Sequence, residues 1–364
     1  MATGYLHATY EQAGASNYAP STGNENAAAT AYSGKAMYFP IMSAKPTLGP
    51  NPLERDDELR NYDQPIARIT DTYDPTWDYE SRAYPDLTGW HLANLLGRTT
   101  NYTAAVGPTA TNLDGTTALA AGQYSHTWVA PFGPSGAIPQ SSRFVFAYAD
   151  QSVFYEVRGA ATEQLEITTP DQGGAQVKAS GPATFLNTIA NPSLTPAYET
   201  PGIRPFVHGN LSVTYADTSS GYTTANAGTA SEFAVTIRNP VNAIRTLGVS
   251  SQYPDRLEKD DTPVMISGTL SKRNLTQADW DAMRNLQTFT LTASWVSTTY
   301  LDGASGAKYG LQIKIPNAQL VSGDIDNLDN KRRHGSQFQW QAIYDGTTAS
   351  ATIKLVNKTA TYAV

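Results

Sequence analysis

The stretch of the chain that is richest in oxygen ligands is 324–330, with the sequence DIDNLDN. Its three carboxylates, on Asp324, Asp326 and Asp329, are ligands that a hard cation such as calcium prefers. The ligand order differs from that of an EF-hand loop, and the glutamate that ends such a loop is missing. We therefore expect a solvated polar turn here and keep a metal site as the alternative.

Motifs that place a catalytic group or a phosphate are absent. The sequence contains no Gly-x-Ser-x-Gly, no phosphate-binding loop with Lys-Ser/Thr, no dinucleotide-binding glycine pattern and no His-Glu-x-x-His. Its five histidines are scattered, and His91 is expected on a helix surface. Many carboxylates could form a glycosidase pair, and nothing selects two of them. We expect no catalytic residue and no cofactor, hence no enzyme, with a hydrolase on a β scaffold as an alternative.

Aromatic residues gather at Trp77, Tyr79, Tyr84 and Trp90. Such a cluster can line a sugar-binding platform, although packing in a β-sandwich core or an interface is the commoner role. A carbohydrate-binding or adhesin-like β module therefore stays open as an alternative.

A short acidic motif occurs twice. Both copies are ordinary solvated loop tips by composition, but their recurrence favours a shared contact role. The contact candidates are Leu53, Glu54, Arg55, Asp56, Asp57 and Glu58 in the first copy, and Leu257, Glu258, Lys259, Asp260 and Asp261 in the second.

The composition indicates an all-β protein with many turns. Charged residues make up 16% of the 364 residues, below the roughly 25% that is usual, while the chain has 28 Gly, 22 Pro and 21 Tyr. The net charge of −7 disfavours tight nucleic-acid binding, because such a surface repels phosphate. The absence of cysteine excludes disulfides and thiolate metal sites. Neither a signal-peptide pattern nor a membrane-length apolar run is found, so we expect an unsecreted protein without membrane contact.

The best-defined local element is 261–295, which predicts a strand, a short helix and a strand. Thr276 suits a helix N-cap, with Asp279 three residues later. Trp280, Met283 and Leu286 follow at spacings of three and predict an apolar stripe that lies on one side of a sheet. The flanking strands are predicted at 264–271 and 288–296.

The same plan appears once upstream. Residues 76–96 can be laid without gaps on 266–286, which places Trp90 on Trp280 and Leu96 on Leu286. Further matches keep the same order: 4–10 with 209–215, 47–49 with 246–248, and the acidic motif. We predict two tandem copies of one fold, namely 1–190 with a long N-terminal arm or loop at 11–34, a Pro-rich linker at 191–206, and 207–364.

Alternating residues predict further strands. A meander of hairpins is expected at 143–148, 153–157, 164–167 and 175–178, and a last hairpin joins 337–343 to 351–356 through Asp345–Gly346. The Gly, Thr and Ala stretch at 97–122 is expected to be a loop.

With this duplicated unit, the chain resembles the major tail tube proteins of long-tailed, siphovirus-type bacteriophages, in the form with two tandem tube domains. The acidic excursions, the two strand–helix–strand units and the hairpins of 142–184 carry the resemblance. Residues 341–345 followed by 353–357 are similar to the family's C-terminal strand pair. The resemblance spans nearly the whole chain.

The resemblance implies a β-sandwich or half-barrel tube fold with one short helix per domain, anchored by Trp90, Leu96, Thr276, Trp280, Met283 and Leu286. It further implies a homotrimeric ring with pseudo-sixfold symmetry, rings that stack through the acidic motifs, and a channel through which double-stranded DNA passes without specific binding. Channel-facing side chains are expected to be acidic or small and polar. The implied partners are the tape measure, terminator and tail-tip proteins, and the implied location is the virion tail, assembled in the host cytoplasm. A tail terminator or tail-tip ring protein is the alternative within phages.

Overall fold

The computed structural model describes the following residues, to which every structural statement below refers: 4–10, 36–53, 69–97, 101–130, 141–148, 153–192, 204–216, 223–224, 230–245, 252–272, 277–303, 306–325, 336–344, 346 and 349–362. We call residues 4–192 half 1 and residues 204–362 half 2. The predicted N-terminal arm and most of the predicted linker lie outside the described residues, so the domain boundary stays a prediction.

Half 1 contains strands and one helix. They are β1 Gly4–Tyr10, β2 Ala36–Pro40, β3 Ser43–Thr47, β4 Pro50–Leu53, β5 Ile69–Tyr73, β6 Thr76–Arg82, α1 Pro85–Leu96, β7 Tyr102–Val106, β8 Tyr124–Ala130, β9 Ser141–Tyr148, β10 Val153–Ala161, β11 Gln164–Thr169, β12 Gln176–Pro182 and β13 Phe185–Ile189.

Half 2 is built in the same way. It comprises a 3-10 turn, η3 His208–Asn210, followed by β14 Leu211–Ala216, β15 Thr223–Thr224, β16 Ala230–Arg238, β17 Val241–Ile244, β18 Arg256–Lys259, β19 Met265–Lys272, α2 Gln277–Arg284, β20 Thr288–Tyr300, β21 Lys308–Ile325, β22 Ser336–Ala342 and β23 Ala351–Asn357. The predicted all-β-dominated fold with one short helix in each half is confirmed.

The strand pairings of half 1 recur in half 2. Apart from the pairing of β7 with β8, each described pairing within half 1 has a counterpart: β1–β2 and β14–β15, β1–β9 and β14–β20, β9–β10 and β20–β21, β10–β13 and β21–β23, β11–β12 and β21–β22, β6–β12 and β19–β22, β3–β6 and β16–β19, and β4–β5 and β17–β18. The single long strand β21 makes the pairings that β10 and β11 share in half 1.

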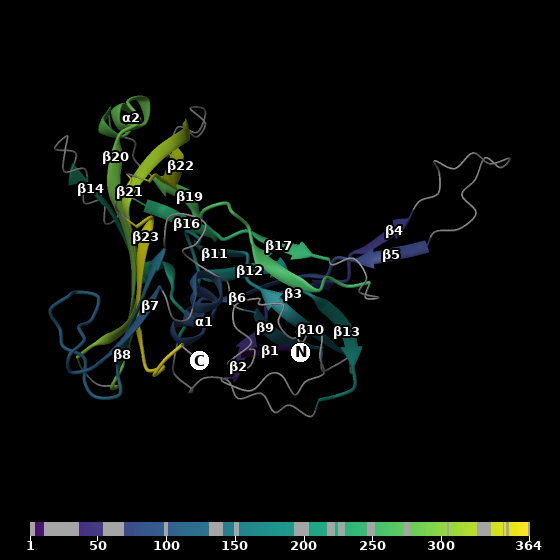
Figure 1. Ribbon diagram of the computed structural model, residues 1–364. Helices are drawn as coiled ribbons and strands as arrows, with labels where there is room; N and C mark the ends of the chain where they lie inside the picture. Colours follow the sequence, from purple (N-terminus) through teal and green to yellow (C-terminus); the bar gives the residue numbers. More distant parts are fainter. Residues whose placement is uncertain are drawn as a thin grey trace.

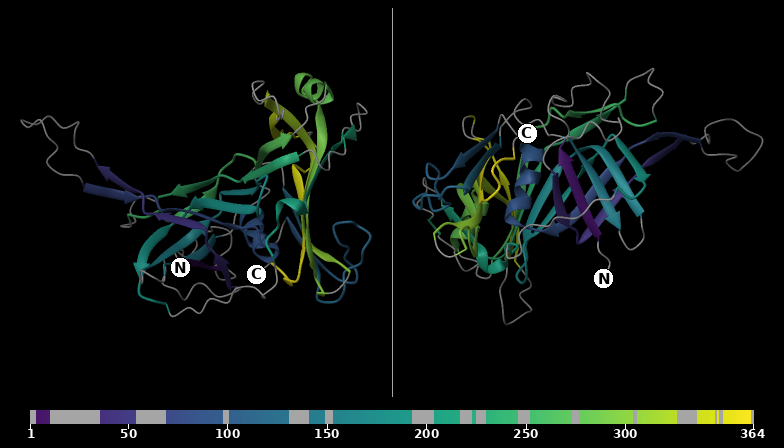
Figure 2. Two further views of the ribbon diagram at one scale, coloured as in Figure 1. Left: turned by 180° about the vertical axis from the view of Figure 1, so that it is seen from behind. Right: turned by 90° about the horizontal axis from the view of Figure 1, so that it is seen from below.

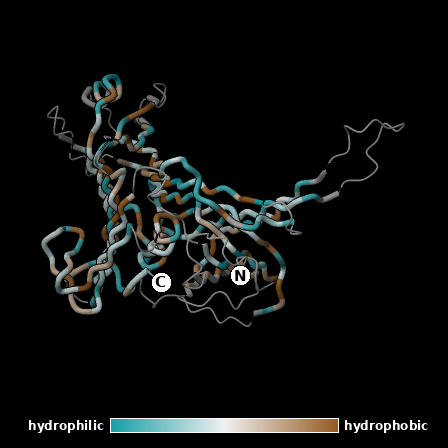
Figure 3. The backbone as a smooth tube through the Cα atoms, viewed as in Figure 1, coloured by the Kyte–Doolittle hydropathy of each residue, from teal (hydrophilic) through white to brown (hydrophobic). Residues whose placement is uncertain are grey.

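One sheet runs through both halves. We call the inner sheet the strands β3, β6, β12, β11, β16, β19 and β22 with residues 318–325 of β21, in that order. The outer strands of each half cover one side of it, with β13, β10, β9, β1 and β2 in half 1. In Figure 1, β14, β20, β21 and β23 of half 2 stand upright together with β7 and β8 of half 1, and β3, β6, β10 and β13 of half 1 lie across. Hydrophilic and hydrophobic segments alternate along the strands (Figure 3), as expected of sheets that bury one face.

Tryptophan fills the space between the sheets. Trp77, Trp90, Trp128, Trp295 and Trp340 are all less than 2% exposed. The aromatic cluster noted in the sequence is therefore mostly core, since Tyr79 is buried as well. A sugar platform made of these rings is excluded, because their faces do not reach solvent.

Helix α1 lies inside this core. Pro85 at its first position has no N–H to leave unpaired, and Gly97 ends the helix at φ 103° while donating its N–H to Ala93. All twelve residues are buried. The expectation that His91 lies on a helix surface is thus wrong, because the helix has no exposed face.

The structure corrects three further expectations. The last two strands form no hairpin: β22 pairs with β19 and β21, whereas β23 pairs with β21 and β8. The predicted loop at 97–122 contains β7, because small residues also pair in a strand that lies at a sheet edge.

The third correction concerns the gapless match of 76–96 with 266–286. It places Trp77 on Ser267, which is exposed, although the buried faces of β6 and β19 must correspond. A shift of one residue brings Trp77 to Gly268. Trp77 then faces Gly181 in half 1 as Gly268 faces Trp340 in half 2. Glu80 then falls on Ser271. Met42, which donates its N–H to the carbonyl of Glu80, falls on Ser231, the bulged residue of β16.

Candidate assembly surface

The solvent face of the inner sheet is mostly polar, with Met265 at the start of β19 as an exposed apolar exception. In half 2 it consists mainly of uncharged side chains that alternate with core residues: Ser267, Thr269 and Ser271 of β19, and Gln337, Gln339 and Gln341 of β22. These amides and hydroxyls carry no net charge. This part of the face therefore offers hydrogen-bonding groups but only a weak electrostatic field.

Charged side chains occur on the same face, mainly in half 1, and they offset one another. Lys178 of β12 lies directly opposite Glu80 on one neighbouring strand and Glu166 on the other. Among the side chains described on this face, charges of both signs are equally frequent, with Lys45, Arg82, Lys178 and Arg238 against Asp78, Glu80, Glu166 and Glu232, and the register of β21 adds Asp324 to the same face. The face is therefore close to neutral, although the chain as a whole is acidic.

Both ends of the inner sheet are open edges in the described part of the chain. At one end, β3 pairs with β6 alone. At the other end, residues 320–325 of β21 pair with β22 alone. Their counterparts inside the chain, β16 and β11, pair with each other along six residues and join the two halves. The strand pairing that joins the two halves inside the chain therefore has no equivalent at the two ends of the inner sheet.

Sequence reasoning did not single out these two edges. The last residues of β21 were expected to belong to the solvated polar turn that begins at Asp324, since aspartate has little strand propensity. The signal that identifies the edges is the internal junction between β11 and β16, and this is a contact between distant parts of the sequence.

Two hairpins project from the inner sheet. The hairpin of half 2, β17–β18, lies against half 1: the ring of Tyr253 stacks on Tyr73 at 5.1 Å, and Arg245 forms an ion pair with Asp74. The hairpin of half 1, β4–β5, reaches away from the body of the molecule (Figures 1 and 2). Its tip, 54–68, lies outside the described residues.

The acidic motifs are not structural counterparts. Leu53 ends β4, the first strand of its hairpin, whereas Leu257 lies in β18, the second strand of the other. Leu257 is fully buried against Ala161 and Val241 and packs within one chain. Glu54, Arg55, Asp56, Asp57 and Glu58 lie outside the described residues. The contact role proposed for the motifs stays a prediction.

Asp260 has a local role in the second motif. One of its carboxylate oxygens accepts hydrogen bonds from the N–H and the hydroxyl of Thr262, each at 2.8 Å, and the other accepts from Asn242 at 3.0 Å. The bond from the Thr262 N–H is the main cause of the lowered pKa of Asp260. This carboxylate closes the turn after β18, while Asp261 beside it is exposed.

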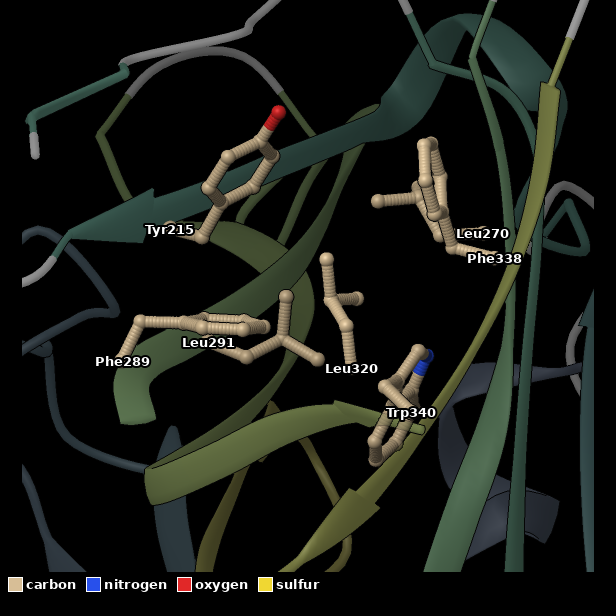
Figure 4. A pocket seen from close by; sticks show the side chains of 7 residues that line it. All are labelled: Tyr215, Leu270, Phe289, Leu291, Leu320, Phe338 and Trp340. Carbon is tan, nitrogen blue, oxygen red and sulfur yellow. The ribbon is translucent and has the colours of Figure 1, made fainter. Parts of the chain in front are cut away.

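An apolar cavity opens in half 2 between the inner sheet and the outer strands. It contains about 320 Å³ of empty space including its mouth, and seven side chains line it: Tyr215, Leu270, Phe289, Leu291, Leu320, Phe338 and Trp340 (Figure 4). Its lining offers no group for chemistry beyond one phenol and one indole.

The remaining predicted positions are placed as follows. Asp324 lies in β21, whereas Asp326, Asp329 and Thr276 lie outside the described residues. Among the described residues, no group of three or more His, Asp or Glu side chains is arranged to hold a metal ion. Trp90 and Leu96 are buried, and Trp280 lies in α2. Met283 is half-buried, but Leu286 is exposed and lies beyond the end of α2, so its predicted anchoring role is wrong. No described helix is both long and apolar enough to span a bilayer.

Comparisons with known proteins assign no family. No protein-family model matches the chain, and no curated protein matches it either. Among solved structures, a double mutant of the Hcp1 protein from E. coli EAEC 042 pathovar aligns at 10% identity over 39% of this chain and 96% of that chain, with a TM-score of 0.20. A score of this size does not support a shared fold.

Proposed function

We propose that this chain is a structural virion protein that assembles with copies of itself into stacked rings. The rings form the tail tube of a long-tailed bacteriophage, which conducts double-stranded DNA into the host. The observation that carries this proposal is the pair of open edges on the inner sheet, because their counterparts are already paired inside the chain.

Pairing between copies repeats the internal junction. Inside the chain, Leu165 lies opposite Ile237 and Ile167 lies opposite Val235. When the corrected strand correspondence is applied to the open edges, Gly323 of one copy lies opposite Leu48 of the next. In the same register Ile325 lies opposite Pro46. Such pairing satisfies the unpaired backbone groups that an open edge would otherwise leave.

Repeated pairing of this kind closes a ring. Each half contributes four strands to the inner sheet, and identical steps between copies close into a barrel when their rotation adds up to a full turn. With the sixfold arrangement implied by the resemblance, three copies complete the ring. The edge at β3 of one copy pairs with the edge at β21 of the next in a head-to-tail contact. A closed homotrimer therefore leaves no edge of the inner sheet open.

The polar face of the inner sheet suits a channel for DNA. Tight binding to phosphate needs a surplus of cationic side chains, and this face has no such surplus. Acidic or small polar side chains are expected along such a channel, and this proposal is supported in half 2 by a face of uncharged serine, threonine and glutamine side chains. In the proposed ring this face lines the channel, and DNA slides past hydroxyls and amides without base contacts.

Pro46 distinguishes the junction between copies from the one inside the chain. Its counterpart in β16 is Val235, which has an N–H, whereas proline has none. Prolines at sheet edges also hinder unwanted pairing. The junction between copies is therefore the weaker of the two, which favours closure with the correct register over random aggregation.

The rest of the proposal follows the resemblance. The chain acts without catalysis and without a cofactor. Its partners are further copies of itself and the tape measure, terminator and tail-tip proteins, and its place is the virion tail after assembly in the host cytoplasm. The acidic motifs contribute contacts between stacked rings.

The test is a designed cross-link between copies. The chain has no cysteine, so a pair introduced as Asp324→Cys and Thr47→Cys can react only with itself. These positions face each other in the proposed register, and directly opposed strand residues are close enough for a disulfide. Oxidation should give a covalent trimer in a denaturing gel, and electron microscopy should show rings or tubes. The matched control pairs Asp324→Cys with Thr76→Cys, one strand further away, and should give no trimer.

Two results would overturn the proposal. One is a monomer at high concentration in native mass spectrometry, without rings in the micrographs. The other is rings that lack the cross-link of the designed pair. Single rings that never stack would instead identify a terminator or tail-tip ring.

A further inference from the structure

The two helices differ in what covers them. Helix α1 belongs to half 1, yet half 2 covers it. The amide of Asn239 donates to the carbonyl of Leu95 at 2.8 Å, and the amide of Asn357 donates to the carbonyl of Pro85 at 3.3 Å. The ring of Tyr362 fills the space beside Gly89. Strands β8 and β23 lie against the same helix.

Helix α2 has no such cover from the described part of the chain. It stands at the end of β20 and β21 (Figure 1) and packs on β21. Ala282 is buried and Met283 is half-buried, but Arg284 and Asn285 at its end are exposed. Half 2 also has no counterpart of β7 and β8, since α2 leads directly into β20.

Leu286 combines two unfavourable features. Its side chain is 58% exposed, and its backbone has φ 50°, a conformation that glycine and asparagine adopt far more readily than leucine. The helix of half 1 ends differently, because its last residue, Leu96, is fully buried and is followed by Gly97 at φ 103°. A free protein gains nothing from an exposed leucine at this position, whereas a protein that buries it on assembly does.

The apolar cavity lies next to α2. The sulfur of Met283 and the ring of Phe338 approach the same side of Gly323, and Phe338 lines the cavity (Figure 4). Met283 thus connects α2 to the cavity. The helix, Leu286 beyond its end and the cavity make up one surface beside the open edge of β21, with Arg284 and Asn285 as its polar part.

We propose that this surface is a docking site for a second copy of the chain, whose strand β13 covers α2 as β23 covers α1. The inference rests on the proposed function, because it assigns a second contact to the same ring. Strand β13 is the counterpart of β23. Its residues Asn187 and Thr188 are exposed, whereas Leu355 and Val356 near the end of β23 are buried. The internal contact of α1 therefore shows both the site and its occupant.

The first experiment replaces Leu286 by asparagine. Leu286→Asn removes the apolar side chain and suits the backbone conformation, so the isolated chain should be at least as stable as the wild type in denaturant unfolding. Ring formation, followed by native mass spectrometry over a concentration series, should need at least tenfold more protein. The control Val106→Asn changes a valine that is 46% exposed on β7 and should assemble like the wild type.

The second experiment locates the contact. A photo-reactive cross-linker at position 284 should join neighbouring copies in assembled rings through a peptide that contains β13, and the unassembled chain should give no such product. Rings that form normally with Leu286→Asn, or whose cross-links from position 284 miss β13 while the Asp324→Cys and Thr47→Cys pair is cross-linked, would overturn the docking site and leave the proposed function standing. A wild-type chain that forms no rings would overturn both.

Discussion

Helix α1 and helix α2 occupy equivalent places in the order of strands, but only α1 is part of a core. All residues of α1 are buried, and half 2 supplies much of the cover. Helix α2 ends in exposed side chains. The same strand-pairing pattern therefore gives one half whose helix is covered and one half whose helix is exposed at its end. The difference lies in which elements pack against each helix. Four predictions test this difference between the halves.

The largest effect is expected from the tryptophan of α1. Trp90→Ala should lower the free energy of unfolding by about 3–5 kcal/mol, because it leaves a large cavity in a packed core. Leu286→Ala should change it by less than about 0.5 kcal/mol, as surface substitutions usually do. Urea unfolding of the isolated chain measures both. Similar losses for the two variants would contradict the contrast between the helices.

Acid should weaken half 1 through His91. Complete burial lowers the pKa of this imidazole from 6.5 to about 3, and its Nε2 contacts the hydroxyl of Tyr79. The folded-state pKa lies below the unfolded one, so this contribution is fully present above pH 6.5 and is lost as the pH falls toward 3. The loss should amount to a few kcal/mol.

The measurement compares urea unfolding at several pH values for the wild type and His91→Gln. The variant should show a shallower decline between pH 6.5 and 3, since a neutral amide does not titrate. Parallel curves would show that His91 contributes nothing to acid sensitivity.

The joint between the halves should respond to Asn239. Asn239→Ala removes the bond to Leu95 at the end of α1 and should cost about 1–3 kcal/mol, the usual penalty for a lost partner in a buried site. Asn242→Ala, at an exposed position on β17, should have a much smaller effect. Thermal unfolding of both variants decides whether the joint depends on this contact.

The smallest effect is expected at the two hairpins. Arg245→Ala breaks an ion pair whose partners are both partly exposed, and should cost no more than about 1 kcal/mol. The loss should shrink further in high salt. A large loss that is independent of salt would mean that the position of β17–β18 depends on this ion pair.

Part of this architecture could be predicted from the sequence. The strand–helix–strand unit around Trp280 and the strands at 143–148 and 153–157 were predicted correctly, because buried side chains impose periodicity on their neighbours. The buried Trp77 shows that the gapless match was wrong by one residue in β6, and a shift by one residue reverses the buried face of a strand.

Other features could not be predicted. The repeated acidic motif pointed to equivalent positions, but Leu53 and Leu257 lie on different strands of their hairpins. A match of a few residues does not determine which strand of a hairpin a segment forms. The pairing of β23 with β8 joins Ile353 to Trp128, and the junction of β11 with β16 is likewise non-local. Single-sequence patterns describe neighbours along the chain and therefore miss such contacts.

The fusion at β11 and β16 has a consequence for how a wall of this kind is made. We call each contact between neighbouring halves a seam. In a proposed ring of three chains, every second seam lies within one polypeptide, so the effective concentration of its two halves does not fall on dilution. Only three seams must be found by diffusion. Assembly should be faster for that reason. The closed ring can also dissociate at only half as many contacts as a ring of six separate subunits.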